Sequence, residues 1–557
     1  MSKRIIISGL SFYLKTILLT PQDSVIFPQD MWLAYVFIGD IMVKTNVTYK
    51  SEKEKIMYKT VMPQITKKKP ARIGLYSAGL DVYWTQFAGL YDCLMEYNHF
   101  LETQMQAYGE VFNFGMVDSA EKGHAAGEYF NEHNVDIIFS HAATYYTSTT
   151  LLPIHQINNA PVIVLNLQPT PEMDYAATGT DRWLAQCVAC PIPEIANAFN
   201  RAKIPFRVIS GLLGLDYTPA FAKADENTKN RPEAKKVWAE IGDWCQAAMV
   251  KRNLRGARFG FLGGYYSGML DMYSDFTMLQ AQTGIQVEVL EMCDLEKYLK
   301  MVTEEEIIEK IKEIETVFEI SGDSPSDPIA KKPTADQMKW SATVAAAQEK
   351  MVKERKLDSI SYYYHGQDNY YEEIQSGFIV GHSLLTAQGV ACAGEGDIKT
   401  AIAMKISDLL ETGGSYCEIV AADFNRETMI LGHDGPFHFA ISKGRPILRG
   451  MGVYHGKRGN GVSVEAKVNA GLVTTLGVTQ TVDGKLKFNI SEGEAIDAPI
   501  LMNGNTSTHI KFAEKPAEYM DKWFMEAPTH HLALSVGHNA KIFAKVAELL
   551  NLPHATF

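Results

Sequence analysis

Short apolar segments alternate with amphipathic segments along residues 71–411. The stretch "RIGLYSA" (72–78) has the continuous apolar character of a buried strand, and residues 85–105 follow with a helical period. The alternation continues through the apolar stretches "VDIIFSHA" (135–142) and "APVIVLNLQ" (160–168). Strands that alternate with helices predict a parallel sheet covered on both faces. In such sheets, ligands bind beyond the carboxyl ends of the strands.

The strand-and-helix pattern begins again at Arg258 and changes after about Gly413. The stretch "RFGFLGGYYSGML" (258–270) predicts a strand, a glycine-rich turn and a helix, and Thr303 with Glu306 forms a capping box for a later helix. Beyond Gly413, glycine-rich turns separate short β-type segments, which is typical of an antiparallel barrel or sandwich. We therefore predict an α/β fold with two doubly wound parallel-sheet domains, followed by a mostly antiparallel, β-barrel-like C-terminal domain.

These changes of pattern divide the chain into four expected parts. The first α/β domain is expected over residues 70–254, the second over 255–411, and the β-rich domain with a terminal helix over 412–557. Residues 1–69 are expected to be an N-terminal extension outside the fold. Our hypothesis is that the part before Met62 reflects a misplaced start codon. The start of the chain is basic and then apolar, but no stretch is long enough to span a bilayer.

Charge and cysteine content narrow the classes of partner. The chain of 557 residues has a formal net charge of -12, which argues against nucleic acid or an anionic membrane as a main partner. Its 7 cysteines are odd in number and scattered, so a reducing, cytoplasmic compartment suits them better than a disulfide framework. Cys187 and Cys190 form a lone CxxC, for which two small buried thiols are favoured over a zinc site.

A glycine-rich turn, Gly263-Gly264-x-x-x-Gly268, follows the first strand of the second domain. It lacks the GxGxxG spacing of a dinucleotide-binding turn and the GK[ST] of a P-loop. Tight packing between a strand and the next helix is therefore favoured over phosphate binding.

Acids and histidines near element ends in the last third of the chain are the strongest candidates for chemistry. They are Glu395, Asp397, Glu418, His433, His530 and His531. Mixed oxygen and nitrogen ligands suit Mn²⁺, Co²⁺, Fe²⁺ or Zn²⁺, and argue against Ca²⁺ or a structural cysteine zinc site. The competing interpretation is structural: acids before a helix serve its N-terminus, Glu418 is a surface acid, and histidines in turns are hydrogen-bonded.

Four short motifs in order resemble the L-arabinose isomerase and L-fucose isomerase superfamily, in a less characterised branch. They are "GEGDIKTA" (394–401), "GGSYCE" (413–418), "LGH" (431–433) and "PTHH" (528–531). The resemblance extends more weakly upstream, through "GLDVYWTQFAGL" (79–90), to about Pro70. The "LGH" turn is one residue shorter than the arabinose isomerase motif, and the tail after "PTHH" is shorter than in the family.

The resemblance implies an aldose–ketose isomerase that works through an ene-diolate. Its metal ligands would be Glu395, Glu418, His433 and His531, with His530 as the alternative to His531. Glu395 and Glu418 would also act as the acid/base pair, and the metal would be Mn²⁺, with Co²⁺ or Fe²⁺ as alternatives. The resemblance further implies a homo-oligomer, a trimer or hexamer, with the site at a subunit interface.

Substrate contacts are expected from two further places. Trp84 and Gln86 offer a stacking face and a hydroxyl partner, although Trp84 is equally compatible with a core position. His365, Gln367 and Asp368 follow a predicted strand of the second domain, where a turn held by polar side chains is the competing account. His530 completes this predicted set.

Two residues of the "GEGD" segment are given supporting roles. Asp397 is expected to cap the helix that follows and to orient a metal ligand. Lys399 either neutralises nearby acid or lies on a solvated helix surface. A non-catalytic sugar-binding or regulatory protein, and a metal-dependent epimerase or hydrolase on the same scaffold, remain the alternatives to an isomerase.

Overall fold

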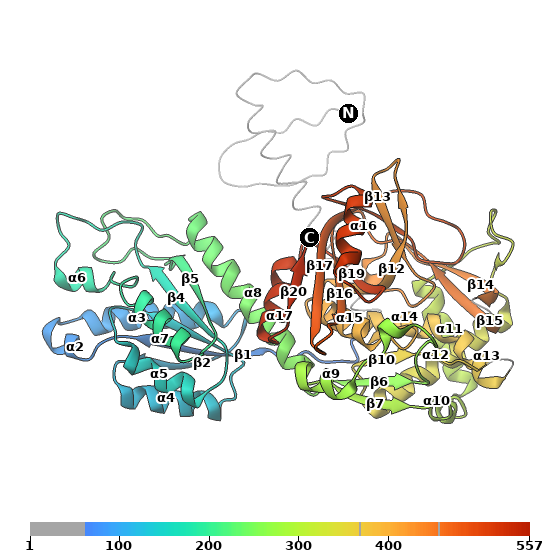
Figure 1. The fold of residues 1–557 in the computed structure, drawn as a ribbon, viewed down its shortest axis with the longest axis horizontal. Coiled ribbons are helices and arrows are strands. Elements are labelled where there is room, and N and C mark those ends of the chain that lie inside the picture. The colour runs from blue at the N-terminus through green and yellow to red at the C-terminus, as the bar shows by residue number, and fades with distance from the viewer. Residues whose placement is uncertain (1–61, 367–368, 455–456) are drawn as a thin grey trace, which may run out of the picture. The chain divides into compact units, whose positions relative to one another are not determined.

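The computed structural model describes residues 62–366, 369–454 and 457–557 (Figure 1). The expected N-terminal extension is therefore described only from Met62, and the hypothesis about residues 1–61 lies outside the described residues. The side chains of Gln64 and Thr66 donate hydrogen bonds to the backbone oxygens of Ala387 and Gly389, each at 2.9 Å. Within the described ranges, every helix is too short or too polar to cross a membrane.

The first sheet is parallel, with the strand order β2-β1-β3-β4-β5. Its strands are β1 (Ala71–Ala78), β2 (Gly109–Val117), β3 (Ile137–Ala142), β4 (Val162–Gln168) and β5 (Phe206–Leu212). This order is that of a doubly wound fold, in which the chain changes direction between β1 and β3.

Alternate side chains of β1 pack into two different cores, which shows that both faces of the first sheet are covered. Ile73 and Leu75 belong to a cluster with α3 (Leu90–Met105) and α8 (Pro232–Leu254). Tyr76 belongs to a cluster that includes residues of the other helices of this region. Those helices are α4 (Ala120–Glu132), α5 (Ser148–Ile157) and α7 (Ile192–Arg201).

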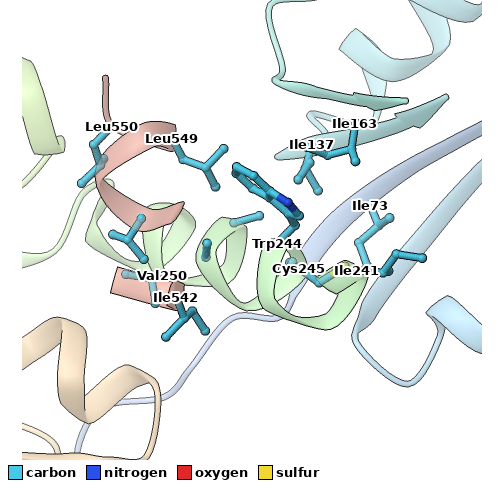
Figure 2. Close-up of a cluster of buried hydrophobic side chains, with 14 of the residues drawn as sticks. Ile73, Ile137, Ile163, Ile241, Trp244, Cys245, Val250, Ile542, Leu549 and Leu550 are labelled. Atoms are coloured by element: carbon cyan, nitrogen blue, oxygen red, sulfur yellow. The ribbon is translucent and has the colours of Figure 1, made fainter. Parts of the chain in front are cut away.

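Helix α8 links this first core to the C-terminal helix α17 (Ala540–Leu549). Figure 2 shows Ile241 and Trp244 of α8 beside Ile73 of β1, with Ile542 of α17 in the same cluster. Helix α8 thus buries apolar side chains against both the first sheet and α17.

The second sheet is also parallel, with the strand order β11-β10-β6-β7. Its strands are β6 (Arg258–Leu262), β7 (Gln286–Leu290), β10 (Ser359–Tyr362) and β11 (Ala391–Ala393). Ala391 and Ala393 face a cluster that contains α15 (Ile398–Leu409), whereas Cys392 packs with α12 (Ala335–Arg355) and α14 (Phe378–Ala387). This sheet is therefore covered on both faces as well, as predicted. The carboxyl ends of its strands lie at one edge, where the loops after β6, β10 and β11 meet.

The C-terminal part is a closed antiparallel barrel in the order β16-β19-β12-β13-β18-β17, with β16 pairing β17 to complete the ring. Its strands are β12 (Gly413–Asp423), β13 (Thr428–Gly432), β16 (Gly471–Gln480), β17 (Leu486–Ile496), β18 (Thr508–Phe512) and β19 (His531–Val536). A further strand, β20 (His554–Thr556), pairs with β17 in parallel. The predicted fold class, two doubly wound α/β sheets followed by an antiparallel barrel, is confirmed.

Helix α15 lies between the second sheet and the barrel (Figure 1). It contacts β10 and β11 on one side and β12, β16 and β19 on the other. Because it is covered all round, Asp408 is its one residue that is not buried. The residues just before α15 are thereby held between the sheet and the barrel.

The remaining elements fill loops around these sheets. A small sheet joins β8 (Glu319–Ile320), β9 (Ala330–Lys331), β14 (Ile447–Tyr454) and β15 (Lys457–Glu465). The other helices are α2 (Val82–Gln86), α6 (Thr180–Leu184), α9 (Phe276–Thr283), α10 (Met292–Leu299), α11 (Glu304–Val317), α13 (Tyr370–Ser376) and α16 (Pro516–Met525). Short 3-10 turns occur at η1 (Leu270–Met272) and η2 (Phe439–Ile441).

Candidate metal centre

Glu395 is presented by a tight turn at the carboxyl end of β11. The backbone of Glu395 is left-handed, with φ 60°, and Gly396 follows with φ 81°. A Cβ at Gly396 would clash with the carbonyl oxygen of Gly264, so the turn requires glycine there. The carbonyl of Glu395 accepts a hydrogen bond from the backbone N–H of Tyr266 at 2.9 Å. The glycine-rich turn after β6 therefore packs closely against the turn that carries Glu395, and not, as was predicted, against a helix that directly follows β6.

Asp397 caps the helix that follows it, as expected, and it also contacts His531. One carboxylate oxygen, Oδ1, accepts hydrogen bonds from the backbone N–H groups of Lys399 at 3.1 Å and Thr400 at 3.0 Å, which caps α15. The other oxygen, Oδ2, lies 3.0 Å from Nδ1 of His531. Burial acts to raise the pKa of Asp397, but the hydrogen bond with His531 and the charge of Lys399 lower it, and the net direction is downward. An ionised carboxylate only accepts, so the proton of His531 sits on Nδ1 and Nε2 carries the lone pair.

Strand register in the barrel brings three of the other candidates together. Glu418 of β12 pairs with His531 of β19 on one side, and with Gly432 of β13, next to His433, on the other. From the sheet side, Oε2 of Glu395 lies 3.5 Å from Nε2 of His531, and Oε1 lies 3.9 Å from Nε2 of His433. Two groups of potential ligand atoms, each within 4.8 Å, result: Glu395 with His433 and His531, and Glu418 with His530 and His531.

His530 and His531 differ in charge although they are adjacent. Nδ1 of His530 lies 2.6 Å from Oδ2 of Asp271, and its Nε2 lies 3.7 Å from Oε2 of Glu395. Burial acts to lower the pKa of His530, but the two carboxylates raise it to about 10. Burial lowers the pKa of His531, an effect that Asp397 only partly offsets. Only a neutral imidazole offers a lone pair to a cation, so His531 is the better ligand of the two.

His433 is also held by a neighbouring carboxylate. Its Nδ1 lies 2.7 Å from Oδ1 of Asp434, and its Nε2 faces Glu395. Burial acts to lower the pKa of His433, but the charge of Asp434 raises it, and the net direction is upward. Each of the three histidines is thus oriented by a different aspartate.

Three residues that contact the histidines were not predicted from the sequence. The hydroxyl of Tyr416 lies 2.8 Å from Nε2 of His531, and Asp271 and Asp434 hold His530 and His433. Tyr416 precedes Glu418 by two positions on a strand, so period-2 alternation places both on one face. Asp434 is adjacent to its histidine. Asp271 lies 259 residues from His530, and no local pattern connects the two.

The donor set fits a divalent cation. Oε2 of Glu395 is buried and has no hydrogen-bond partner among the described residues; its nearest imidazole nitrogens are 3.5 Å and 3.7 Å away. Burial acts to raise the pKa of Glu395, but His530, His531 and His433 lower it, so the carboxylate is ionised. A buried, ionised oxygen without a donor carries a large desolvation cost, which a bound cation would offset. Mixed carboxylate and imidazole donors match Mn²⁺, Co²⁺ and Fe²⁺.

Apart from His530, the residues expected to contact substrate are not joined to this cluster by any hydrogen bond, ion pair or ring contact in the described part of the chain. Nε1 of Trp84, in α2, donates to Oδ2 of Asp118 at 2.9 Å, and its ring packs edge-on against Tyr91. Gln86 and His365 are exposed. Gln367 and Asp368 lie outside the described residues. The substrate contacts expected of this set, that of His530 included, therefore stay predictions.

Comparison with known proteins was made once this geometry was established. Residues 274–413 match the family model of the L-arabinose isomerase central domain. No curated protein matches the chain. The matched stretch contains Glu395 and Asp397 and ends before Glu418. It confirms the resemblance to the L-arabinose isomerase superfamily and indicates an isomerase of carbohydrate metabolism.

Proposed function

We propose that this chain, whose residues 274–413 match the L-arabinose isomerase central domain, is a divalent-cation-dependent enzyme that interconverts an aldose and a ketose. One observation carries the proposal: Glu395 from the second sheet meets His433 and His531 from the barrel, with a buried carboxylate oxygen that lacks a hydrogen-bond partner among the described residues. A bound cation would give this oxygen the partner that it lacks.

Four residues would hold the cation: Glu395, Glu418, His433 and His531. We propose Mn²⁺ as the cation, with Co²⁺ or Fe²⁺ as alternatives, because these ions share a preference for this donor set. When bound, such a cation supplies Lewis-acid stabilisation of the negative charge that develops on the sugar oxygens. The imidazoles of His433 and His531 would complete the coordination without adding negative charge to that of the two carboxylates.

The two glutamates would move the proton. Exchange between an aldose and a ketose requires removal of a proton beside the carbonyl and addition of a proton to the neighbouring carbon, through an ene-diolate of the sugar. The lowered pKa of Glu395 keeps its carboxylate ionised and able to accept that proton. Glu418 is the partner on the barrel side and would supply the return proton. His530, a cation held by Asp271, would donate to a sugar hydroxyl.

The surroundings of the site complete the proposal. We propose that the sugar is contacted by five further residues: Trp84, Gln86, His365, Gln367 and Asp368. We also propose that the protein is a homo-oligomer, a trimer or hexamer, with the site at a subunit interface.

All seven cysteines are free thiols, which supports a reducing, cytoplasmic location. Domain boundaries near residues 70, 255 and 412 follow the changes of pattern in the sequence.

A panel of aldoses tests the function. Purified protein is stripped with a chelator, reloaded with Mn²⁺ and given pentoses, hexoses and deoxyhexoses, and ketose formation is measured. We expect ketose from at least one sugar, and only with the cation. Glu395→Gln and Glu418→Gln should each abolish turnover, while Glu518→Gln, an exposed glutamate of α16, should leave it unchanged. Ketose from none of the sugars, with the cation bound, contradicts an isomerase; sugar binding alone would favour a non-catalytic sugar-binding protein.

A further inference from the structure

The side chain of Tyr416 packs against two histidines of the proposed metal centre. It is fully buried, and its ring lies 4.6 Å from the rings of both His433 and His531. Two glycines pack closely around it: a Cβ at Gly394 or Gly435 would come within 3.1 Å or 2.9 Å of its ring. These contacts hold the ring against both imidazoles in the cation-free chain.

The hydrogen bond between Tyr416 and His531 has a defined direction. Asp397 accepts from Nδ1–H of His531, so Nε2 carries the lone pair and the Tyr416 hydroxyl donates to it over 2.8 Å. A tyrosine hydroxyl keeps its proton at neutral pH, so it can serve as the donor. In the cation-free chain, the lone pair of Nε2 therefore accepts a hydrogen bond from the Tyr416 hydroxyl.

Nε2 of His531 has one lone pair, and a cation would need the same lone pair. The two partners therefore exclude each other. We infer that Tyr416 is a positioning residue that holds Nε2 of His531 in the cation-free protein and yields it when a cation binds. This inference rests on the proposed function, because it assumes that His531 is a ligand. Because the cation must displace the Tyr416 hydroxyl, the affinity for the cation is lower than it would be without that hydroxyl. In the cation-free protein, the same hydrogen bond orders the His531 imidazole.

Removal of the hydroxyl tests the exchange. Because a cation no longer has to break a hydrogen bond, chelator-stripped Tyr416→Phe protein should bind Mn²⁺ roughly 2- to 10-fold more tightly than the wild type in calorimetric titration. Tyr519→Phe is the matched control: Tyr519 is buried, and its hydroxyl contacts Ser491 of the barrel at 3.2 Å. This control should retain wild-type affinity.

The outcomes separate the inference from the function. Equal or weaker Mn²⁺ binding by a folded Tyr416→Phe variant overturns the inference and leaves the proposed function standing. Absence of Mn²⁺ binding by the wild-type protein overturns both. Should Tyr416→Phe fail to fold, nuclear magnetic resonance of the wild type decides: the Tyr416 hydroxyl proton should be protected in stripped protein and lost when Zn²⁺ is added. Its persistence with Zn²⁺ bound overturns the inference.

Discussion

Nδ1 of His531 lies 3.0 Å from Oδ2 of Asp397, and both side chains are fully buried. The same Asp397 side chain caps α15, the helix between the second sheet and the barrel. One carboxylate therefore fixes the start of a helix and the tautomer of an imidazole that is contributed by another part of the fold. The start of α15 and the tautomer in which His531 could bind a cation therefore depend on the same carboxylate.

Asp397→Asn should separate these two roles. Asparagine caps helices as well as aspartate does, so the stripped variant should remain folded. Its amide, however, presents a donor where Oδ2 accepted, which moves the His531 proton to Nε2 and blocks the lone pair. We expect Mn²⁺ affinity to fall about 10- to 100-fold by calorimetry. Asp521→Asn, on the exposed face of α16, is the control, and equal affinities for the two variants would show that Asp397 acts as a cap alone.

Glu395→Gln should remove the thermal response to the cation. In the wild type, Mn²⁺ at 100 times its Kd should stabilise the fold by about 2.7 kcal/mol and raise Tm. The variant lacks the charge and the acceptor that make the site favourable, so its Tm should not change with Mn²⁺. Differential scanning calorimetry with and without the cation measures this, with Glu518→Gln as the control. A rise in the Glu395→Gln variant equal to that of the wild type would remove Glu395 from the ligand set.

Gly396→Ala tests the turn that presents Glu395. A left-handed backbone alone costs a non-glycine residue about 1–2 kcal/mol, and at Gly396 an added Cβ also meets the carbonyl oxygen of Gly264. Gly256 has a similar φ of 82° but open space around its Cβ position. In urea unfolding, Gly396→Ala should therefore lose at least about 1 kcal/mol more than Gly256→Ala, because overpacking adds to the backbone strain. Equal losses would mean that the two glycine-rich turns are not in close contact.

Lys399→Met tests a buried lysine beside the site. Lys399 is fully buried, and its Nζ donates to the carbonyl of Met272 at 2.8 Å and to Oγ of Ser274 at 2.9 Å. Its removal leaves these acceptors unpaired and the charge of Asp397 less compensated, with an expected loss of about 3 kcal/mol in the free energy of unfolding. Lys541→Met, on the exposed side of α17, should change stability by less than about 0.5 kcal/mol. A similarly small effect at Lys399 would contradict its burial.

The sequence predicted the fold, and it singled out residues that the structure brings together, because both depend on local patterns. Alternation of strands and helices indicated the two parallel sheets, and Glu418 and His433 stand in short motifs at element ends. The cap at Asp397 followed from its place before a helical run. Lys399 is different: the sequence left it open between a role beside the acids and a solvated surface. Its amine is hydrogen-bonded to Met272 and Ser274, more than a hundred residues earlier in the chain, and no pattern within the helix predicts that contact.

Long-range contacts account for most of what the sequence did not predict. Asp271 meets His530 only because the loop after β6 lies beside the turn before β19. Tyr416 stands inside a motif and was still missed, since a tyrosine on a strand is ordinarily a core residue. The substrate role of Trp84 depends on which surface faces it in an assembly, and a single chain does not contain that surface.

Isomerisation in D₂O tests the central claim most directly. The aldose panel is incubated with Mn²⁺-loaded protein and followed by nuclear magnetic resonance. Because the account requires proton transfer between neighbouring carbons, we predict a ketose that carries solvent deuterium at C1, formed by the wild type and by neither the stripped protein nor Glu395→Gln. A Mn²⁺-loaded wild-type protein that forms no ketose and leaves the C2 proton of every aldose in place would contradict the account.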